Sequence, residues 1–524
     1  MLYDEKIWMG QDYDGAEKLC ILPEMVNRHG LITGATGTGK TITLKVMAES
    51  LSEMGVPVFL SDVKCDLAGM LLPGTETQDM AERKKYFGLD AAGFRYQGYP
   101  VEFWDVEGKG GLPLRTTISE FGPTLLARLL ELSELQADIL SIVFRIADEH
   151  QLLLLDTKDL RAMLQHVAEH SKEYSETYGN MSKQSLNAIL RAVVALETEG
   201  GDRFFGEPAI DIHDFMVKGA DGKGCINIMD ARKTMQNPRI YSTFMLYMLS
   251  ELFEQMPEVG DMAEPSMVFF FDEAHLLFEG APKALIAKIE QVVKLIRSKG
   301  IGVYFISQNP ADIPDTVLAQ LGNKVQHALR AYTPAEKKRV HAAAQAFRAN
   351  PAFDTEAVLE ELGTGEALIS FLDQDGRPQM VRRARILPPE SKMGPVEESE
   401  RTAAIKASAL YQKYAEMIDR DSAYEYFKRK SGQEELERQE AKEAEEREKR
   451  EAREQESMAK QEEKERKKKL ATVKSVGRST AGTLGREVGY AVGKELFGSS
   501  IGRRIGGNIG AALGRGILDT LLGR

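Results

Sequence analysis

Cysteine, histidine and tryptophan are scarce in this sequence of 524 residues, which contains three cysteines, eight histidines and two tryptophans. Cys20, Cys65 and Cys225 lie far apart and match no metal-ligand spacing, and the histidines form no ligand cluster. Such a composition excludes a disulfide framework and argues against a structural metal. We therefore expect a reduced, cytoplasmic protein.

Signals for secretion or membrane insertion are also missing. The first residues, Met1 to Lys6, show no basic segment followed by an apolar core, and no apolar run reaches the length of a membrane span. Net charge is −12, so the molecule as a whole repels polyanions. Binding to nucleic acid would then require a local basic surface or the lumen of a ring.

One stretch matches a nucleotide-binding pattern at every position. Residues 34–41 fit G-x-x-x-x-G-K-[ST], with an apolar run before them and a helical pattern over residues 42–49. Backbone N–H groups of such a loop surround phosphate oxygens, and the following helix adds the positive end of its dipole. We predict that Lys40 reaches the β- and γ-phosphates and that Thr41 ligates Mg²⁺. The predicted ATP-binding residues are Gly34, Ala35, Thr36, Gly37, Thr38, Gly39, Lys40, Thr41 and Ile42. A Gly/Thr-rich turn that matches by chance is the alternative.

Apolar strands alternate with helical stretches from residue 30 onward. The expected strands are 30–32, 56–60, 101–104, 225–228, 267–271, 301–306 and 325–330. This alternation predicts a parallel sheet covered on both faces, with ligands at the carboxyl ends of its strands. Between about 119 and 220 the pattern becomes helical throughout, which predicts an all-helical insertion.

Asp272 and Glu273 follow the apolar run Met267–Phe271 directly. A carboxylate at a strand end can hold Mg²⁺, and the next one can polarise the attacking water, so we assign Asp272 and Glu273 to those roles. A solvated acidic turn is the alternative. Asp62 and Lys64 end an earlier strand, where they either line the pocket or form a salt-bridged loop.

Gln308 follows the next strand and is our candidate for sensing the γ-phosphate; alternatively it caps the loop before Pro310. Oligomeric ATPases usually complete the site with an arginine from a neighbouring subunit. Arg330 and Arg297 fit that role, and we favour Arg330, although either can be structural. We expect the basic residues at 283–299 and 337–339 to supply positive charge near the ATP edge of the sheet. They become nucleic-acid candidates only where a ring gathers several copies.

The composition changes after Arg385. Residues 434–469 are almost entirely charged, with Gln and Ala, which predicts a solvated single helix or a disordered segment. From Gly477 the chain is Gly-rich and basic, with small residues at 502, 506 and 510. That spacing allows close helix packing within an oligomer, or contact with a protein or a membrane surface. A flexible tail is the alternative.

Four blocks of this sequence resemble the HerA/FtsK superfamily of P-loop ATPases, and specifically the bacterial HerA-like helicase-domain family. They are residues 27–33, 55–64, 271–275 and 300–308, and the likeness spans about 21–387. The resemblance implies a RecA-like core with an extra strand between the P-loop strand and the Asp-Glu strand, an intersubunit arginine and a hexameric ring. Cys65 stands where the family pattern Asp-Val-Lys-Gly-Asp has glycine, so the turn there is expected to differ.

These observations predict an α/β P-loop ATPase that uses ATP and Mg²⁺. Expected segments are a short lead-in with one or two strands (1–29), the core in two parts (30–118 and 221–390), the helical insertion (119–220), a charged helical linker (391–476) and the Gly-rich tail (477–524). The leading hypothesis is a hexameric motor that translocates on or unwinds double-stranded DNA. The alternative is an ATP-driven switch or scaffold that acts on protein or membrane partners.

Overall fold

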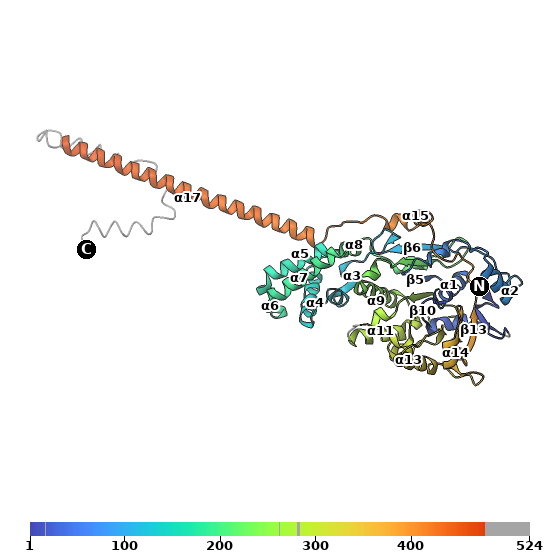
Figure 1. Cartoon of the computed structure of the whole chain (residues 1–524). Helices are drawn as coiled ribbons and strands as arrows, with labels where there is room; N and C mark the ends of the chain where they lie inside the picture. Colours follow the sequence, from blue (N-terminus) through green and yellow to red (C-terminus); the bar gives the residue numbers. More distant parts are fainter. Residues whose placement is uncertain (16, 261, 280–282, 477–524) are drawn as a thin grey trace. The chain divides into compact units, whose positions relative to one another are not determined.

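The computed structural model describes the chain except for residues 16, 261, 280–282 and 477–524, and it leaves the side chains of 283–285 and 470–476 undescribed. The expected Gly-rich tail therefore lies outside the described residues. Met1–Arg429 forms one compact unit and Lys430–Arg524 a second (Figure 1). Among the described residues, no helix combines the length and apolar character that crossing a bilayer requires.

One sheet of 13 strands organises the first unit within the described residues. Its order is β1-β2-β13-β12-β11-β4-β10-β9-β5-β8-β6-β7, and β3 pairs with β2. The strands from β11 to β7 in that order pair in parallel, and β1, β2, β3, β12 and β13 add antiparallel pairs. The bounds are β1 Leu2–Tyr3, β2 Lys6–Asp12, β3 Lys18–Ile21, β4 Gly30–Thr33, β5 Val58–Asp62, β6 Val101–Asp105, β7 Leu112–Pro113, β8 Ile226–Asp230, β9 Met267–Phe271, β10 Ile301–Ser307, β11 Asn323–Gln326, β12 Glu366–Ser370 and β13 Arg382–Ile386.

The extra strand implied by the resemblance is β10. It pairs in parallel with β4 on one side and with β9 on the other, so it separates the P-loop strand from the strand that ends at Asp272. The fold class predicted from the sequence, a mostly parallel sheet with helices on both faces, is confirmed.

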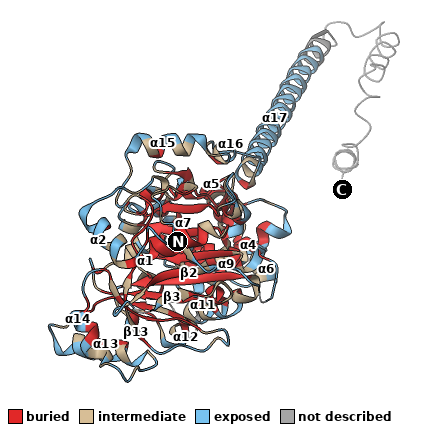
Figure 2. Cartoon of the chain, turned by 90° about the vertical axis from the view of Figure 1, so that its right-hand side faces the viewer, coloured by how far each residue is buried: buried red, intermediate tan, exposed pale blue. Residues whose placement is uncertain are grey.

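Strand residues alternate between two apolar cores, one on each face of the sheet. Met267, Phe269 and Phe271 of β9 join the core that also contains residues of α9 (Pro238–Gln255) and α11 (Lys283–Ile296). Val268 and Phe270 join the other core, together with α1 (Lys40–Glu53). This alternation explains the near-continuous apolar runs, because both strand faces are covered. Figure 2 shows the buried residues concentrated in the sheet and in the helices against it.

The insertion between β7 and β8 is helical, and that interval, which the structure describes completely, contains no strand. Capping boxes at Thr117, Ser133 and Asp156 explain where its first helices begin. Its elements are α3 Ile118–Leu129, α4 Glu134–Glu149, α5 Thr157–Glu169, α6 Ser171–Tyr178, α7 Lys183–Thr198, α8 Gly201–Phe204 and the 3₁₀ turn η3 Ile212–Met216.

Short helices and 3₁₀ turns complete the chain. They are η1 Pro23–Arg28, η2 Ala68–Leu71, α2 Gln78–Phe87, η4 Thr234–Gln236, α10 His275–Phe278, η5 Arg297–Lys299, η6 Pro310–Asp312, α12 Asp315–Leu318, α13 Pro334–Gln345, α14 Thr355–Glu361, α15 Glu398–Ala407 and α16 Tyr411–Tyr414, followed by the long α17, Ala423–Val476.

Both ends of the first unit differ from expectation. The lead-in forms β1, β2 and β3 rather than one or two strands, and it extends the central sheet because β2 pairs with β13. Residues 391–429 are not a linker: Arg401, Tyr414 and Ala423 are buried against the core. Beyond them, α17 is a single solvated helix over 434–469, with ion pairs such as Lys460 to Glu456 one turn apart.

Candidate active site

The phosphate loop joins the end of β4 to the start of α1. Gly39 has a φ of 118°, a left-handed value that glycine adopts freely, and α1 begins at the next residue without a side-chain cap. The first N–H groups of such a helix have no partner within the helix and attract anions. Lys40 Nζ donates to the carbonyl oxygens of Gly34 at 2.6 Å and Ala35 at 3.0 Å, so the ammonium lies over the loop.

Asp272 and Glu273 face the loop from the end of β9. Tyr241 donates its hydroxyl to the carbonyl oxygen of Asp272 at 2.7 Å, which anchors the backbone there. Burial raises the pKa of the Asp272 carboxyl to about 7, and the neighbouring Glu273 carboxylate adds to the increase. Burial lowers the pKa of Lys40, an effect that Asp272 and Glu273 oppose.

Glu273 has an unusual conformation. Its φ is 48°, a left-handed value that costs a residue with a side chain on the order of 1–2 kcal/mol. Its Oε2 is buried without a hydrogen-bond partner and lies 3.4 Å from Nδ1 of His275. A strained backbone and an unpartnered carboxylate oxygen are typical of a catalytic position.

Gln308 follows β10 and shares one cavity with both motifs. The loop before Pro310 is capped by other groups: Asn309 accepts from Ala311 N at 3.0 Å, and Asp312 accepts from Ser307 Oγ at 2.7 Å. The alternative that Gln308 serves as this cap is therefore wrong, and its side chain is exposed toward the site.

The shared cavity has a volume of about 540 Å³, within the range of small-molecule sites. Gly34, Ala35 and Thr38 do not line it, and Thr38 Oγ1 instead donates to Ala35 O at 2.7 Å within the loop. The sequence-predicted residues that line the cavity are Thr36, Gly37, Gly39, Lys40, Thr41, Ile42, Lys64, Asp272, Glu273 and Gln308.

The turn after β5 keeps a glycine-like backbone despite Cys65. Its φ is 60°, and the Asp62 carboxylate accepts from the N–H groups of Lys64, Leu67 and Ala68 at 3.1–3.2 Å. Burial raises the pKa of Asp62 to about 6. Asp62 therefore holds the turn and does not line the cavity, whereas Lys64 does.

The two candidate arginines lie elsewhere. β11 ends at Gln326, not at 330 as expected, so Arg330 lies in the loop before α13, where its guanidinium donates to the carbonyl oxygens of Glu360 and Leu362. Arg297 lies in η5, at the amino end of β10, and this corrects our placement of its basic segment at the ATP edge. Neither side chain lines the cavity, and a role in trans stays a prediction for both.

Several residues near the site carried no motif in the sequence. Thr364, Met393 and Gly394 line the cavity, the last two from the segment that we expected to be a linker. Glu49 of α1 fixes that segment by accepting from Glu390 N at 2.8 Å and Ser391 N at 3.3 Å. Long-range contacts of this kind leave no local signal.

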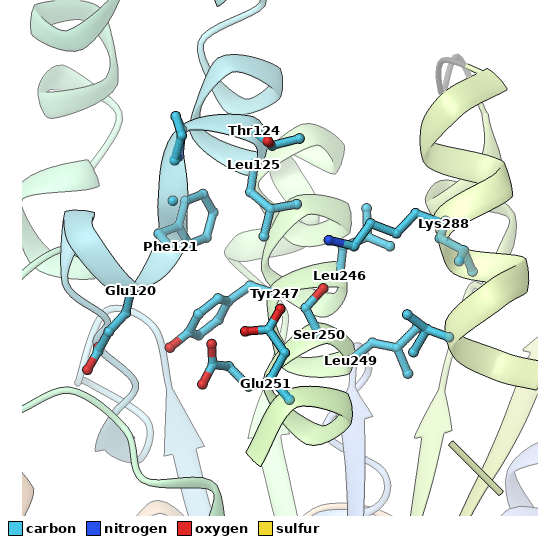
Figure 3. A pocket seen from close by; sticks show the side chains of 15 residues that line it. Glu120, Phe121, Thr124, Leu125, Leu246, Tyr247, Leu249, Ser250, Glu251 and Lys288 are labelled. Carbon is cyan, nitrogen blue, oxygen red and sulfur yellow. The ribbon is translucent and has the colours of Figure 1, made fainter. Parts of the chain in front are cut away.

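A second cavity of about 240 Å³ lies between α3, α9 and α11 (Figure 3). Phe121, Leu125 and Tyr247 form part of its apolar wall, and Glu251 and Lys288 add charge. Burial raises the pKa of Glu251 to about 7, with Glu120 and Glu254 as further causes. This cavity shares no lining residue with the first, so it is separate from the candidate active site.

The sequence is similar to known proteins. The sequence matches the family described as "Helicase HerA-like C-terminal" over residues 8–515. A curated relative is the DNA double-strand break repair helicase HerA of Sulfolobus acidocaldarius, 22% identical over 364 residues that cover 66% of this chain and 62% of the relative. The chain thus spans less than two thirds of that relative's length.

Solved structures also resemble this one. VirB4 of Thermoanaerobacter pseudethanolicus is 16% identical, with a TM-score of 0.45, over 74% of this chain and 97% of that one. The plasmid coupling protein TrwB in complex with ADP and Mg²⁺ is 13% identical, with a TM-score of 0.45, over 71% of this chain and 87% of that one.

Proposed function

This chain belongs to the helicase HerA-like C-terminal family, and on that premise we propose that it is a Mg²⁺-dependent ATPase that works as a hexameric motor on double-stranded DNA. The main support for ATPase activity is that the phosphate loop, Asp272–Glu273 and Gln308 all line the same cavity. The DNA substrate is supported by the activity named for the Sulfolobus relative.

Each residue has a role that follows from its place in the cavity. Lys40 and the N–H groups at the start of α1 hold the β- and γ-phosphates. Glu273 accepts the proton of the attacking water, since its Oε2 is enclosed and unpartnered. Gln308 lines the same cavity and contacts the γ-phosphate or its water.

Two oxygen-bearing side chains in the cavity are suitable ligands for a magnesium ion. Thr41 offers a hydroxyl and Asp272 a carboxyl group in the same cavity, and oxygen ligands are those that Mg²⁺ prefers. When bound, the ion neutralises charge on the phosphate oxygens.

Turnover of Mg-ATP tests the ATPase. Lys40→Ala should abolish nucleotide binding or hydrolysis, whereas Glu273→Gln should bind ATP with an affinity near that of the wild type and lose turnover by at least about 100-fold. Exposed Glu398→Gln is the matched carboxylate control and should keep the wild-type rate. Wild-type turnover in Glu273→Gln would refute the assignment of the base.

DNA dependence is tested separately. The ATPase rate should rise with linear double-stranded DNA at low salt, and the stimulation should fall at physiological salt because phosphate contacts are screened. The mass in solution with ATP should be that of a hexamer. A rate indifferent to DNA at both salt concentrations would reject the motor.

One observation favours the alternative, an ATP-driven switch that acts on protein or membrane partners. Met393 and Gly394 line the nucleotide cavity and belong to the segment that continues through α15 and α16 into α17. Nucleotide binding could thus alter this segment without DNA. For a switch, we expect ATP to change proteolytic protection of residues 391–429 while DNA has no effect on turnover.

A further inference from the structure

His327 lies behind the phosphate loop and is completely buried, with an exposed fraction of 0%. It follows β11, the strand that flanks β4 on the side away from β10. His327 N donates to Thr33 O at 2.7 Å, and Ala35 N donates to Ala328 O at 2.9 Å. Two backbone hydrogen bonds therefore join the segment after β11 to the end of β4 and the first residues of the loop, beyond the paired part of the strands.

The imidazole of His327 joins two further elements. Its Nδ1 lies 2.9 Å from the carbonyl oxygen of Glu366, at the start of β12, and its Nε2 lies 2.8 Å from Oγ1 of Thr43 on α1. A carbonyl oxygen only accepts, so Nδ1 carries the hydrogen and donates, and Nε2 accepts from the Thr43 hydroxyl. Burial lowers the pKa of His327 to about 4, which keeps this neutral form.

The same side chain packs against both glycines that bound the loop. A Cβ added to Gly34 would lie 2.4 Å from Cβ of His327, and one added to Gly39 would lie 3.3 Å from its Cε1. In addition, Gly365 N donates to Thr38 O at 3.0 Å. His327 thus contacts the beginning, the end and the following helix of the loop at once.

We propose that His327 is a positioning residue for the phosphate loop, which it holds in the phosphate-binding arrangement without contacting the nucleotide. This inference rests on the proposed ATPase. If the loop must become ordered when ATP binds, the free energy of that ordering is subtracted from the binding free energy. Loss of the His327 contacts should therefore weaken ATP binding more than it slows the chemical step.

Substitutions at the Thr43 contact test this role without removing the imidazole. Thr43→Val preserves the shape of the side chain but removes the donor to Nε2, whereas Thr43→Ser retains the hydroxyl. His327→Ala removes the whole support. His341→Ala is the matched histidine control, because His341 is exposed on α13 and pairs only with Glu356 and Gln345. Each full-length variant is assayed for KM, kcat, binding of a fluorescent N-methylanthraniloyl ATP with Mg²⁺, and melting temperature.

Thr43→Val and His327→Ala should raise KM and the dissociation constant about tenfold, with kcat changed less than threefold, roughly the effect of a loosened binding loop. Thr43→Ser and His341→Ala should stay within about twofold of the wild type. If Thr43→Val lowers the melting temperature but leaves KM and the dissociation constant unchanged, His327 only packs the core and the inference is wrong. If His327→Ala does not fold, the KM and the dissociation constant of Thr43→Val alone test the inference. A wild-type protein that neither binds nor hydrolyses ATP overturns the proposed function, and the inference with it.

Discussion

Arg401 of α15 fastens the segment after β13 to the core, and its removal should cost the protein about 3 kcal/mol of stability. The guanidinium donates to Gly110 O at 2.6 Å, lies 3.1 Å from the Asp230 carboxylate and stacks on Phe103 at 4.7 Å. In Arg401→Ala, the loss of a charged hydrogen bond to the partly buried Gly110 carbonyl costs about 1.5–3 kcal/mol, and the lost stacking about 1 kcal/mol. Asp230 keeps Arg232 at 2.6 Å, so no unpaired carboxylate remains to add a larger penalty.

Tryptophan fluorescence during urea unfolding measures this effect directly. The two tryptophans, Trp8 and Trp104, are both fully buried in the first unit, so their emission reports its unfolding and not that of the charged helix. Arg429→Ala is the control, because Arg429 pairs with Asp421 on the surface, where such pairs contribute about 0–1 kcal/mol. If Arg401→Ala were no less stable than Arg429→Ala, residues 391–429 would not be docked as described.

Three further predictions test other parts of the structure. Glu251 has a pKa of about 7 in the fold, above its ordinary value of 4.5, so the cost of ionising it appears as pH rises through this range. Glu251→Gln should therefore be more stable than the wild type by up to about 3 kcal/mol at pH 8 and equal to it near pH 4, as thermal melts would show; a difference independent of pH would contradict this. Mixing Arg330→Ala subunits with Lys40→Ala subunits should partly restore ATPase activity if Arg330 acts in trans. If no mixing ratio restores activity, Arg330 does not act in trans and serves only within its own subunit. Tyr241→Phe removes the donor to the Asp272 carbonyl; it should lower kcat about fivefold and stability by about 1 kcal/mol, and an unchanged kcat would show that the anchor is dispensable.

Features encoded in short stretches could be predicted from the sequence. β9 begins and ends as expected because five apolar residues and two acids define it locally, and the phosphate loop is bounded by the expected strand and helix. The turn at Cys65 shows the limit of residue-type reasoning. Hydrogen bonds to Asp62 hold a left-handed backbone there without the glycine that the family pattern contains.

Features that depend on distant partners could not be predicted. The end of β11 is set by where its pairing with β4 and β12 stops, and Val325 to Arg330 give no local sign of that point. His327 is important only because Thr43 and Glu366 converge on it from other elements. The amino-edge position of Arg297, by contrast, follows from the sequence, because Arg297 comes just before the strand expected from residue 301 and ligands gather at the opposite edge of a parallel sheet.

The pairing of β2 with β13 has a consequence for synthesis on the ribosome. Asp12 and Arg382, which form an ion pair beside this contact, are separated by 370 positions in the sequence. At a translation rate of about 5–20 residues per second, β13 is synthesised roughly 20–70 s after β2. During that interval β2 has its early partners β1 and β3, and Trp8 can pack on Phe87, but the edge of β2 that pairs with β13 in the finished fold lacks its partner. β4 likewise lacks β10 and β11 until residue 326 is made, so the nascent chain cannot assemble its nucleotide site until most of the core has been translated.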